Sequence, residues 1–377
     1  MDILVSEMET TREVAALGTH EEELVAPRHA EMRSVWRHHQ DETYTLPSTS
    51  RARQPKFRLM AHGTSLPSAV LDNAQLATEL DVTSDWIESH CGVRSRHVAG
   101  APETTASLGA AAAADVLSRL PGFVPDLLLC ATFTPERRLC PTAPEIAARI
   151  GLRGIGAFDI NAACAGGAVG LLTALAYLDS GLARRILLVC SDTVTKFLGP
   201  RDRSTRILMS DGAAALALEA GVGNCSTLLA SVLRSDGALS RAFSVPIGGS
   251  ESPHGTCHQD GDHLVLMNGP AMFRFATDAA TGVLQGLCAR AGVTGDEISW
   301  IVMHQANLRI IEAVQKRFVT PRDRWLVNID RIGNTVSASI PFLLSQHAVA
   351  GRFESGDIVA IVGFGAGATA AGLLLQW

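Results

Sequence analysis

The sequence predicts an α/β protein in which helices cover a largely buried sheet. Short apolar runs without alternation, such as "DLLLCATF" at 126–133, are typical of strands that are buried on both faces. Helix-like segments separate these runs, as expected for strands joined by crossovers. The order of strand, loop and helix at 298–318 repeats the order that begins at residue 126, which indicates an internal duplication.

Residues 1–55 differ from the rest of the chain and are predicted to form an N-terminal extension. They mix acidic and basic residues and end in "LPSTSRARQP", which is typical of a linker. A short helix at 28–39 and a mobile tail both fit this segment. The remainder divides into two similar halves, 56–222 and 223–377, and a cleft is expected where they meet.

The elements of the two halves follow from the apolar runs and the glycines between them. In the first half, a helix at 168–178 follows a strand and a group of small residues. In the second half, a helix ends at residue 318, and "GFGAG" marks a turn between two late strands. The expected strands lie at 126–133, 157–161, 185–192, 212–220 and 298–303, with two more within 358–377.

Composition excludes several classes of function. The chain of 377 residues is 47% hydrophobic and carries a formal net charge of −6, so no basic excess favours nucleic acid or an anionic membrane. Its start lacks the basic and apolar regions of a secretory signal. Residues 358–377 are uncharged and about as long as a membrane span, but their glycines predict two strands. We therefore expect neither a nucleic-acid partner nor a membrane.

The eight cysteines are scattered without a CxxC pair, which favours free thiols in a reducing, cytoplasmic compartment. The segment "HGTCHQDGDH" at 254–263 contains potential metal ligands. It matches no structural zinc spacing, so we interpret it as a polar surface loop and expect no metal.

Cys164 is the first candidate for chemistry. It follows a strand and lies where a helix should begin, and there the amide N–H groups and the helix dipole favour a thiolate. The neighbouring alanines and glycines would let a substrate approach the sulfur and would leave amides open to an oxyanion. The same pattern also fits an inert buried cysteine.

Three further motifs suit the same chemistry, although each has a simpler interpretation. His304 in "MHQANLRI" follows an apolar strand, at the end where α/β sheets bind ligands, but it also fits a satisfied loop residue. Asn334 in "DRIGNTVSASIP" is either a turn residue or an amide donor aimed at a carbonyl. The glycines of "GFGAG" could bring a backbone N–H to a reacting carbonyl or could form a tight hairpin.

Taken together, these motifs resemble the ketoacyl-acyl carrier protein synthase III family of the thiolase superfamily. The resemblance rests on "ACAGG", "HQANLRII" and "GNTVSASIP", and it extends from residue 57 to residue 377. It also includes "TSDWIESHCGVRSRH", "SDGAAA" and "GFGAG", in the family's order. It implies a layered αβαβα thiolase fold with two pseudo-duplicated halves, acting as a homodimer without a metal or redox cofactor.

The resemblance implies roles for Cys164, His304 and Asn334. Cys164 would attack an acyl thioester and hold the acyl group covalently. His304 and Asn334 would hydrogen-bond the thioester oxygen of a malonyl-type extender and stabilise the enolate left by decarboxylation. The backbone N–H groups of Cys164 and Ala366 would form the oxyanion hole. Ala366 stands where the family usually has glycine, so the loop must accommodate a methyl group.

The resemblance also implies residues at the entrance to the site. Trp86 and Arg203 match positions that stack on the adenine of coenzyme A, and Arg94 matches a basic residue of the same entrance. His90 replaces a pyrophosphate-binding arginine of the family. Because a neutral imidazole cannot replace a guanidinium fork, this departure favours a donor bound to a carrier protein.

A basic patch and an acyl tunnel complete the expected site. Cys140 and Met209 are expected to line the tunnel, and Cys140 takes the place of a phenylalanine that reaches the neighbouring subunit, which leaves room for a longer or branched acyl group. The basic patch would dock an acidic acyl carrier protein, although part of it also fits an ordinary solvated helix face. Its members are Arg274, Arg309, Lys316 and Arg317.

The leading expectation is an acyltransferase of the 3-oxoacyl-[acyl-carrier-protein] synthase III type. It would use acyl-coenzyme A or acyl-carrier-protein thioesters for a decarboxylative Claisen condensation in polyketide or fatty-acid-derived secondary metabolism. One alternative is an acyltransferase that passes the acyl group from Cys164 to an alcohol, an amine or a carrier thiol. Another is a non-catalytic subunit that binds carrier proteins. The retention of Cys164, His304 and Asn334 favours condensation over both.

Overall fold

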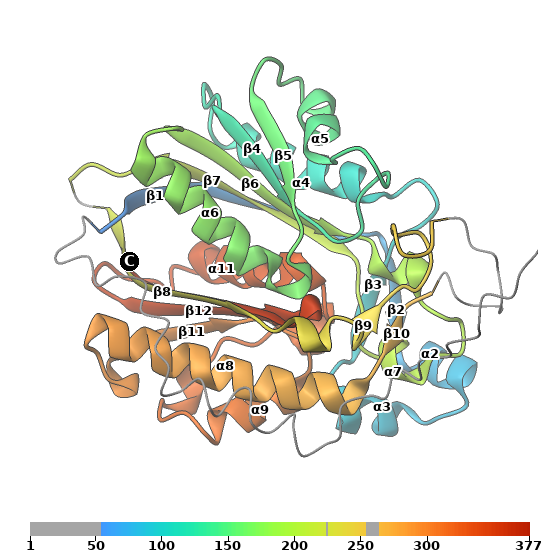
Figure 1. The fold of residues 1–377 in the computed structure, drawn as a ribbon. Coiled ribbons are helices and arrows are strands. Elements are labelled where there is room, and N and C mark those ends of the chain that lie inside the picture. Colours follow the sequence, from blue (N-terminus) through green and yellow to red (C-terminus); the bar gives the residue numbers. More distant parts are fainter. Residues whose placement is uncertain (1–53, 224, 254–263) are drawn as a thin grey trace, which may run out of the picture. The chain divides into compact units, whose positions relative to one another are not determined.

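Nine strands form one hydrogen-bonded series in the computed structural model, which describes residues 54–223, 225–253 and 264–377 (Figure 1). Long apolar runs form most of these strands, because both of their faces are covered. In sheet order they are β11 (Trp300–Met303), β12 (Ile358–Gly365), β13 (Thr369–Gln376), β8 (Ser226–Ser235), β1 (Lys56–Ser65), β7 (Gly212–Ala220), β6 (Arg185–Asp192), β4 (Leu127–Ala131) and β5 (Gly156–Ile160).

The series divides into two half-sheets at β1. This strand pairs with β7 along nearly all of its length, but only Lys56 and Phe57 pair with β8. The first half-sheet therefore contains β5, β4, β6, β7 and β1, and the second contains β11, β12, β13 and β8. In both, a parallel pair (β4 with β6, β11 with β12) is followed by two antiparallel neighbours. This repeated topology agrees with the expected pseudo-duplicated halves.

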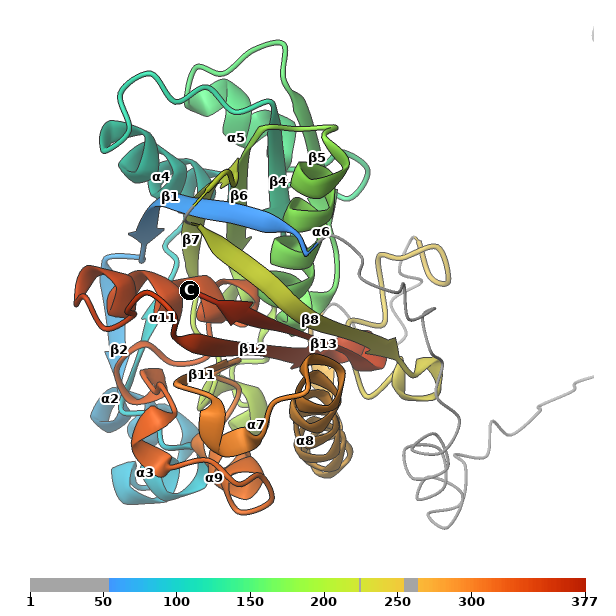
Figure 2. The same ribbon diagram turned by 90° about the vertical axis from the view of Figure 1, so that its left-hand side faces the viewer.

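The helices form three layers around the half-sheets (Figures 1 and 2). α6 (Gly166–Ser180) and α11 (Ser339–Val349) lie between them and contact strands of both. α4 (Thr105–Ser118) and α5 (Ala143–Arg149) cover the outer face of the first half-sheet. α8 (Gly269–Ala291) covers the second, and α9 (Leu308–Gln315) packs against α8. The layered αβαβα thiolase fold is thus confirmed.

Short elements gather on the side of the molecule where β6 and β12 end (Figure 1). They are β2 (Ala69–Asp72), α2 (Asn73–Leu80), α3 (Ser84–Cys91), β3 (Ser95–Val98), α7 (Arg203–Arg206), β9 (Phe243–Ser244), β10 (Leu266–Met267) and α10 (Ile329–Ile332).

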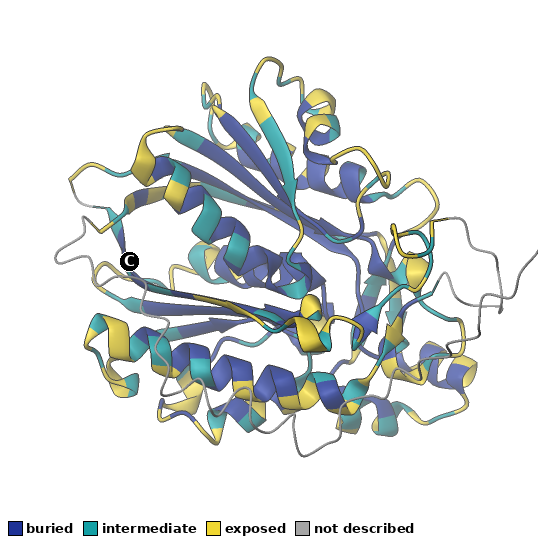
Figure 3. Ribbon diagram, viewed as in Figure 1, coloured by how far each residue is buried: buried dark blue, intermediate teal, exposed yellow. Residues whose placement is uncertain are grey.

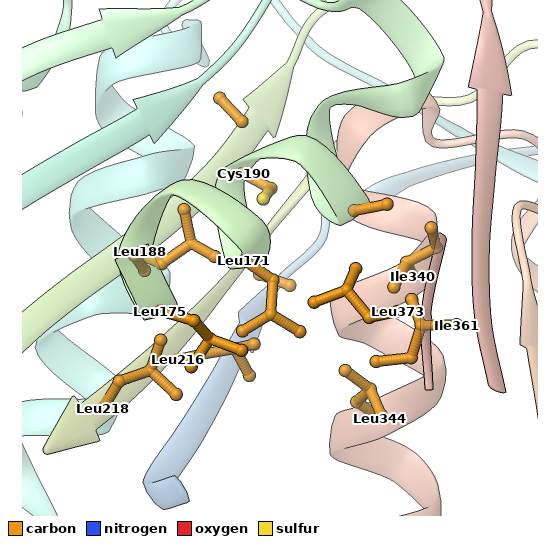
Figure 4. Close-up of a cluster of buried hydrophobic side chains, with 14 of the residues drawn as sticks. Leu171, Leu175, Leu188, Cys190, Leu216, Leu218, Ile340, Leu344, Ile361 and Leu373 are labelled. Carbon is orange, nitrogen blue, oxygen red and sulfur yellow. The ribbon is translucent and has the colours of Figure 1, made fainter. Parts of the chain in front are cut away.

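A large cluster of buried hydrophobic side chains lies around the two central helices (Figures 3 and 4). Leu171 and Leu175 of α6 pack with strand residues of both half-sheets, including Leu216 and Leu373. Because α6 has a sheet on each side, it is apolar around its whole circumference. Residues 163–180 consequently have the length and composition of a membrane span, but 56% of that stretch is buried inside the protein, as in a core helix.

The observed elements refine the expected ones. The strands expected at 185–192 and 212–220 have those bounds, and 358–377 forms β12 and β13 around a tight turn. β4 ends at Ala131, earlier than expected, because the next three residues bond to a buried carboxylate. α9 ends at Gln315, before residue 318. The interpretations of 28–39 and 254–263 lie outside the described residues, and the division at 222/223 stays a prediction.

Candidate active site

Cys164, His304 and Asn334 lie on the wall of one cavity of about 420 Å³. Cys164 comes from the turn before α6, His304 follows β11, and Asn334 follows α10. These segments meet because strands of both half-sheets end at the boundary between the two halves. The wall is mostly apolar; among its members are Ile207, Leu208, Phe243, Met267, Met272 and Ile310.

The end of β12 runs directly against Cys164. A Cβ added at Gly365 would lie 2.7 Å from the backbone nitrogen of Cys164 and 2.8 Å from its Cβ. Only glycine therefore fits at this position without a shift of the backbone. The close approach brings the next residue, Ala366, to the sulfur, and its backbone N–H forms a hydrogen bond that favours the thiolate. The added methyl group of Ala366 is accommodated on the cavity wall.

Cys164 is a thiol in the resting protein. Burial and the negative charge of Asp192 raise its pKa to about 12, although the backbone N–H groups of Cys164 and Ala366 oppose the rise. We expected the helix start to favour a thiolate, but the cost of burying the charge is larger than the contribution of these amides. The site therefore needs a base to remove the thiol proton.

His304 offers a suitable nitrogen. Its side chain is 1% exposed, and burial lowers the pKa of the imidazole to about 3, so the ring is neutral. Nδ1 lies 2.6 Å from Oγ of Ser339, the first residue of α11. Nε2 is buried and has no hydrogen-bond partner among the described residues. The ring also packs edge-on against Phe364, with 5.3 Å between the ring centroids.

Asn334 can only donate toward a ligand. Its Oδ1 accepts a hydrogen bond from the backbone N–H of Val336 at 2.9 Å. Its Nδ2 lies 3.5 Å from the carbonyl of Ala306, a long contact that leaves donor capacity. The backbone on both sides is fixed by bonds to Leu208 and Ser210. The side chain therefore presents its amide N–H groups, as the functional interpretation requires.

Asp192 is a buried site residue that sequence reasoning missed. Oδ1 accepts hydrogen bonds from Thr132 and from the backbone N–H groups of Phe133 and Thr134. Oδ2 accepts from the hydroxyl and the N–H of Ser337. Burial raises the pKa of this carboxyl, and the bonds it accepts oppose the rise. Asp192 thereby joins the loop after β4 to the segment that carries Asn334.

Trp86, Arg203 and His90 stand together at the cavity entrance. The rings of Trp86 and His90 are stacked with 4.0 Å between their centroids, and Nδ1 of His90 lies 2.7 Å from the Trp86 carbonyl. Arg203 donates to the carbonyls of Leu80 and Asp81. Arg94 does not line this cavity; its Nε donates to Glu88 at 2.8 Å on a neighbouring groove.

The two expected tunnel residues lie apart in the structure. Met209 is buried and lines the cavity. Cys140 is exposed and does not line it, and the adjacent Leu139 is 97% exposed. Cys140 thus lies on a surface loop, from which only contact with another molecule would bring it to a tunnel.

The four expected docking residues are exposed, but they are not equally available. Arg317 forms an ion pair with Asp278 of α8 at 2.6 Å, so part of its charge is compensated. Arg309 lies on the same groove as Arg94. In the part of the chain that the structure describes, no group of three or more histidine, cysteine or acidic side chains could hold a metal ion.

Two family models match the chain in the ranges that hold these residues. "3-Oxoacyl-[acyl-carrier-protein (ACP)] synthase III" matches residues 158–237, which include Cys164. "3-Oxoacyl-[acyl-carrier-protein (ACP)] synthase III C terminal" matches residues 288–377, which include His304 and Asn334.

Similar proteins match over nearly the same range. The beta-ketoacyl-[acyl-carrier-protein] synthase III of Sinorhizobium medicae is 39% identical over 322 residues, covering 84% of this chain and 97% of the relative. The crystal structure of 3-oxoacyl-(acyl carrier protein) synthase III from Pseudomonas aeruginosa is 36% identical with a TM-score of 0.79, covering 85% of this chain and 98% of that one. The priming beta-ketosynthase of the R1128 polyketide pathway is 28% identical with a TM-score of 0.77, covering 88% and 99%.

Proposed function

The chain belongs to the 3-oxoacyl-[acyl-carrier-protein] synthase III family of the thiolase superfamily, a family of condensing acyltransferases, and we propose that Cys164, His304 and Asn334 are its catalytic residues. One observation carries this assignment. The buried Nε2 of His304 has no partner among the described residues and belongs to the same cavity wall as Cys164 and Asn334. A neutral imidazole nitrogen left unpaired beside a thiol and an amide donor is suited to a reacting thioester.

In the first step, Cys164 takes the acyl group from a thioester. Because its thiol has a raised pKa, the proton passes to Nε2 of His304 as sulfur attacks the carbonyl. The imidazolium then returns this proton to the leaving thiolate, so a thiol departs and the acyl-cysteine remains. The hydroxyl of Ser339 can accept a hydrogen bond from Nδ1–H or donate one to a bare Nδ1, so the neutral ring can carry its proton on either nitrogen.

In the second step, a malonyl-type thioester loses carbon dioxide. The N–H groups of His304 and Asn334 hydrogen-bond the thioester oxygen and stabilise the enolate that forms. Its carbon attacks the acyl-cysteine carbonyl, whose oxygen is held by the N–H groups of Cys164 and Ala366. The carbon–sulfur bond then breaks, a 3-oxoacyl thioester leaves, and the Cys164 thiolate takes up one proton from water.

The entrance supports a donor carried by a protein. Arg203 is the one arginine among the residues that line the described cavity, and His90 stands where a guanidinium fork would hold a pyrophosphate. A phosphopantetheine arm would place its thioester in the apolar cavity while the carrier protein docks on the basic patch formed by Arg274, Arg309, Lys316 and Arg317. Met209, Met267 and Met272 line the cavity with flexible side chains, which suits a long or branched acyl group.

The proposal also includes the assembly, the compartment and the pathway class. A homodimer would cover the exposed loop of Leu139 and Cys140 and would bring Cys140 to the partner's tunnel. All seven cysteines in the described range are free thiols, which suits the reducing cytoplasm. The likeness to a priming polyketide ketosynthase supports a role in polyketide or fatty-acid-derived secondary metabolism.

The proposal is tested by mass spectrometry and by release of labelled carbon dioxide. The intact protein is incubated with matched acyl-coenzyme A and acyl-carrier-protein donors, followed by malonyl carrier protein labelled at its free carboxyl. We expect an acyl adduct on Cys164 and release of the label. An adduct without release for any extender would favour simple acyl transfer, and no adduct would favour a non-catalytic subunit. Asn334→Ala should form the adduct and release far less label.

A further inference from the structure

A second cavity, of about 450 Å³, lies between β1, α4 and the carboxyl half of α11. It shares no lining residue with the catalytic cavity. α11 connects the two, since it begins at Ser339 beside His304 and reaches this cavity at Ser345. We call it the cationic cavity, because its charged lining residues are Arg119, Arg331 and Arg352 with the single carboxylate Asp115.

The polar groups around the cationic cavity are mainly donors. Both oxygens of Asp115 accept hydrogen bonds from Arg119, each at 2.9 Å. Oε1 of Gln346 accepts from Nδ2 of Asn328 at 2.8 Å, so the N–H groups of Gln346 are left for a ligand. Among the described residues, the one ion pair of Arg331 is a 3.8 Å contact with Asp330. A ligand that matches this wall must be rich in acceptors and negatively charged.

Ser345 supplies an independent indication of a missing partner. Its side chain is 3% exposed, and its Oγ has no hydrogen-bond partner among the described residues. Leaving a buried hydroxyl unsatisfied costs about 1–3 kcal/mol, so such a group requires an explanation. An anion oxygen in the cavity that Ser345 lines would accept this O–H.

The arginines concentrate positive charge on two histidines of the same wall. Burial and then Arg119 lower the pKa of His62, with Asp115 opposing the change. Burial, Arg352 and Arg331 lower the pKa of His347. The groups come from β1, α4, α10, α11 and the loop before β12, so their charges converge from several sides. The arginines therefore disfavour protonation of both histidines, and a bound anion would offset this repulsion.

We propose that the cationic cavity binds a small phosphate-bearing anion. A carboxylate is planar, and a single arginine can bind both of its oxygens. A phosphoryl group has more acceptor positions, which matches a cavity lined by three arginines, two histidines and a hydroxyl. The guanidinium of Arg352 lies 5.2 Å from the ring of Trp300, which holds it in place before a ligand arrives. The site lies apart from the reaction, so this inference does not depend on the proposed condensation.

The test is a calorimetric titration of the full-length protein with inorganic pyrophosphate, inorganic phosphate and adenosine diphosphate at constant ionic strength. We expect one saturable site. Equal affinities for pyrophosphate and the nucleotide would identify a free anion, and a tighter nucleotide would identify the phosphoryl end of a larger metabolite. In proton NMR titrations, bound pyrophosphate should raise the pKa of His62 and His347. The absence of saturable binding, or binding without these shifts, overturns the proposal.

Variants separate this cavity from the entrance of the catalytic site, where Arg203 could also attract an anion. Arg331→Gln combined with Arg352→Gln should weaken binding at least about tenfold. Ser345→Ala should weaken binding and also raise the melting temperature without the anion, because an unsatisfied hydroxyl is removed. Arg153→Gln, an exposed arginine outside the cavity, is the matched control and should change neither. Binding that survives the double substitution overturns the proposal.

Discussion

Two turns of the same backbone shape lead into the two central helices, and only one of them contributes a residue to the cavity wall. Ala163–Ala165 precedes α6 and Val336–Ala338 precedes α11. Each begins at positive φ, 45° at Ala163 and 54° at Val336, which is unusual for residues other than glycine. Cys164 occupies the middle of the first turn and Ser337 the middle of the second. Cys164 lines the cavity, whereas Ser337 is fully buried.

The difference lies in the strand that faces each turn. β6 ends at Asp192, whose carboxylate bonds to Ser337 and so holds the second turn in place. β12, its counterpart, ends at Gly365, which packs against Cys164 without any side chain. One half of the duplication therefore uses a carboxylate to fix the turn. The other leaves room there for a sulfur and for backbone N–H groups.

The largest expected effect comes from removing the central side chain of one turn, compared with the same change in the other turn. Cys164→Ala removes the proposed nucleophile, so acyl adduct formation should fall by at least about a thousandfold. Ser337→Ala, the substitution at the corresponding position, should keep the adduct, because Ser337 is buried and does not line the cavity. Intact-protein mass spectrometry after incubation with an acyl-carrier-protein donor measures both. An adduct on the Cys164→Ala protein would mean that another residue is the nucleophile.

Adding a side chain to the facing strand should produce the next largest effect. Gly365→Ala places a methyl group against the backbone of Cys164, so the turn must shift and condensation should slow roughly a hundredfold. Gly282→Ala in α8 is the matched control, since nothing lies within 4 Å of its new Cβ. Initial rates of carbon dioxide release report the change. Equal rates for both variants would contradict the role given to the β12 approach.

Asp192→Asn tests the opposite turn. The amide places an NH2 group against donors, which should lower the free energy of unfolding by about 3 kcal/mol. Removing the charge should also lower the pKa of the Cys164 thiol from about 12, so alkylation by iodoacetamide at a given pH below that value should become faster. Ser337→Ala keeps the charge and should leave the alkylation profile unchanged. An Asp192→Asn profile identical to that of the parent protein would rule out electrostatic coupling.

The smallest expected effect concerns the neutral imidazole of His304. Its pKa is about 3 in the folded protein and near 6.5 when exposed, so the unfolded chain binds more protons between these values. Its contribution to stability is therefore complete above pH 6.5 and is lost as the pH falls toward 3, by up to roughly 1.4 kcal/mol per pH unit. Chemical unfolding from pH 7 to pH 4.5 should show a shallower decline for His304→Gln. Parallel stability curves for the parent and the variant would mean that the His304 ring is exposed to water.

The strands and the three polar residues that meet in the cavity could be predicted from the sequence because their signals are local. The runs at 185–192 and 212–220 are apolar except near their ends, which favours covered strands. Cys164, His304 and Asn334 each follow a strand or turn signal. Asp192 gave no such signal. It ends an apolar strand, and its partner Ser337 lies 145 residues away in the other half.

The protonation state of Cys164 was not predictable for the same reason. The small residues around it correctly indicated a helix start, but the cost of burying its charge depends on packing that only the assembled halves create. The His304 tautomer likewise depends on Ser339, which belongs to a distant helix. Local patterns thus pointed to three residues that meet in one cavity, but not to the groups that set their charge.

The short ladder between the two half-sheets has a consequence for how the protein unfolds. Ladder pairing between β1 and β8 is limited to Lys56 and Phe57, with one further backbone bond from Leu228 to the carbonyl of Pro55. α6 and α11 contact strands of both half-sheets. If the two halves separated, both central helices would be exposed to water together. An intermediate with only one half unfolded would therefore lack a buried core. Heat should consequently inactivate and unfold the protein in one transition, because the contact between the halves that is lost on heating also forms the cavity that Cys164 lines.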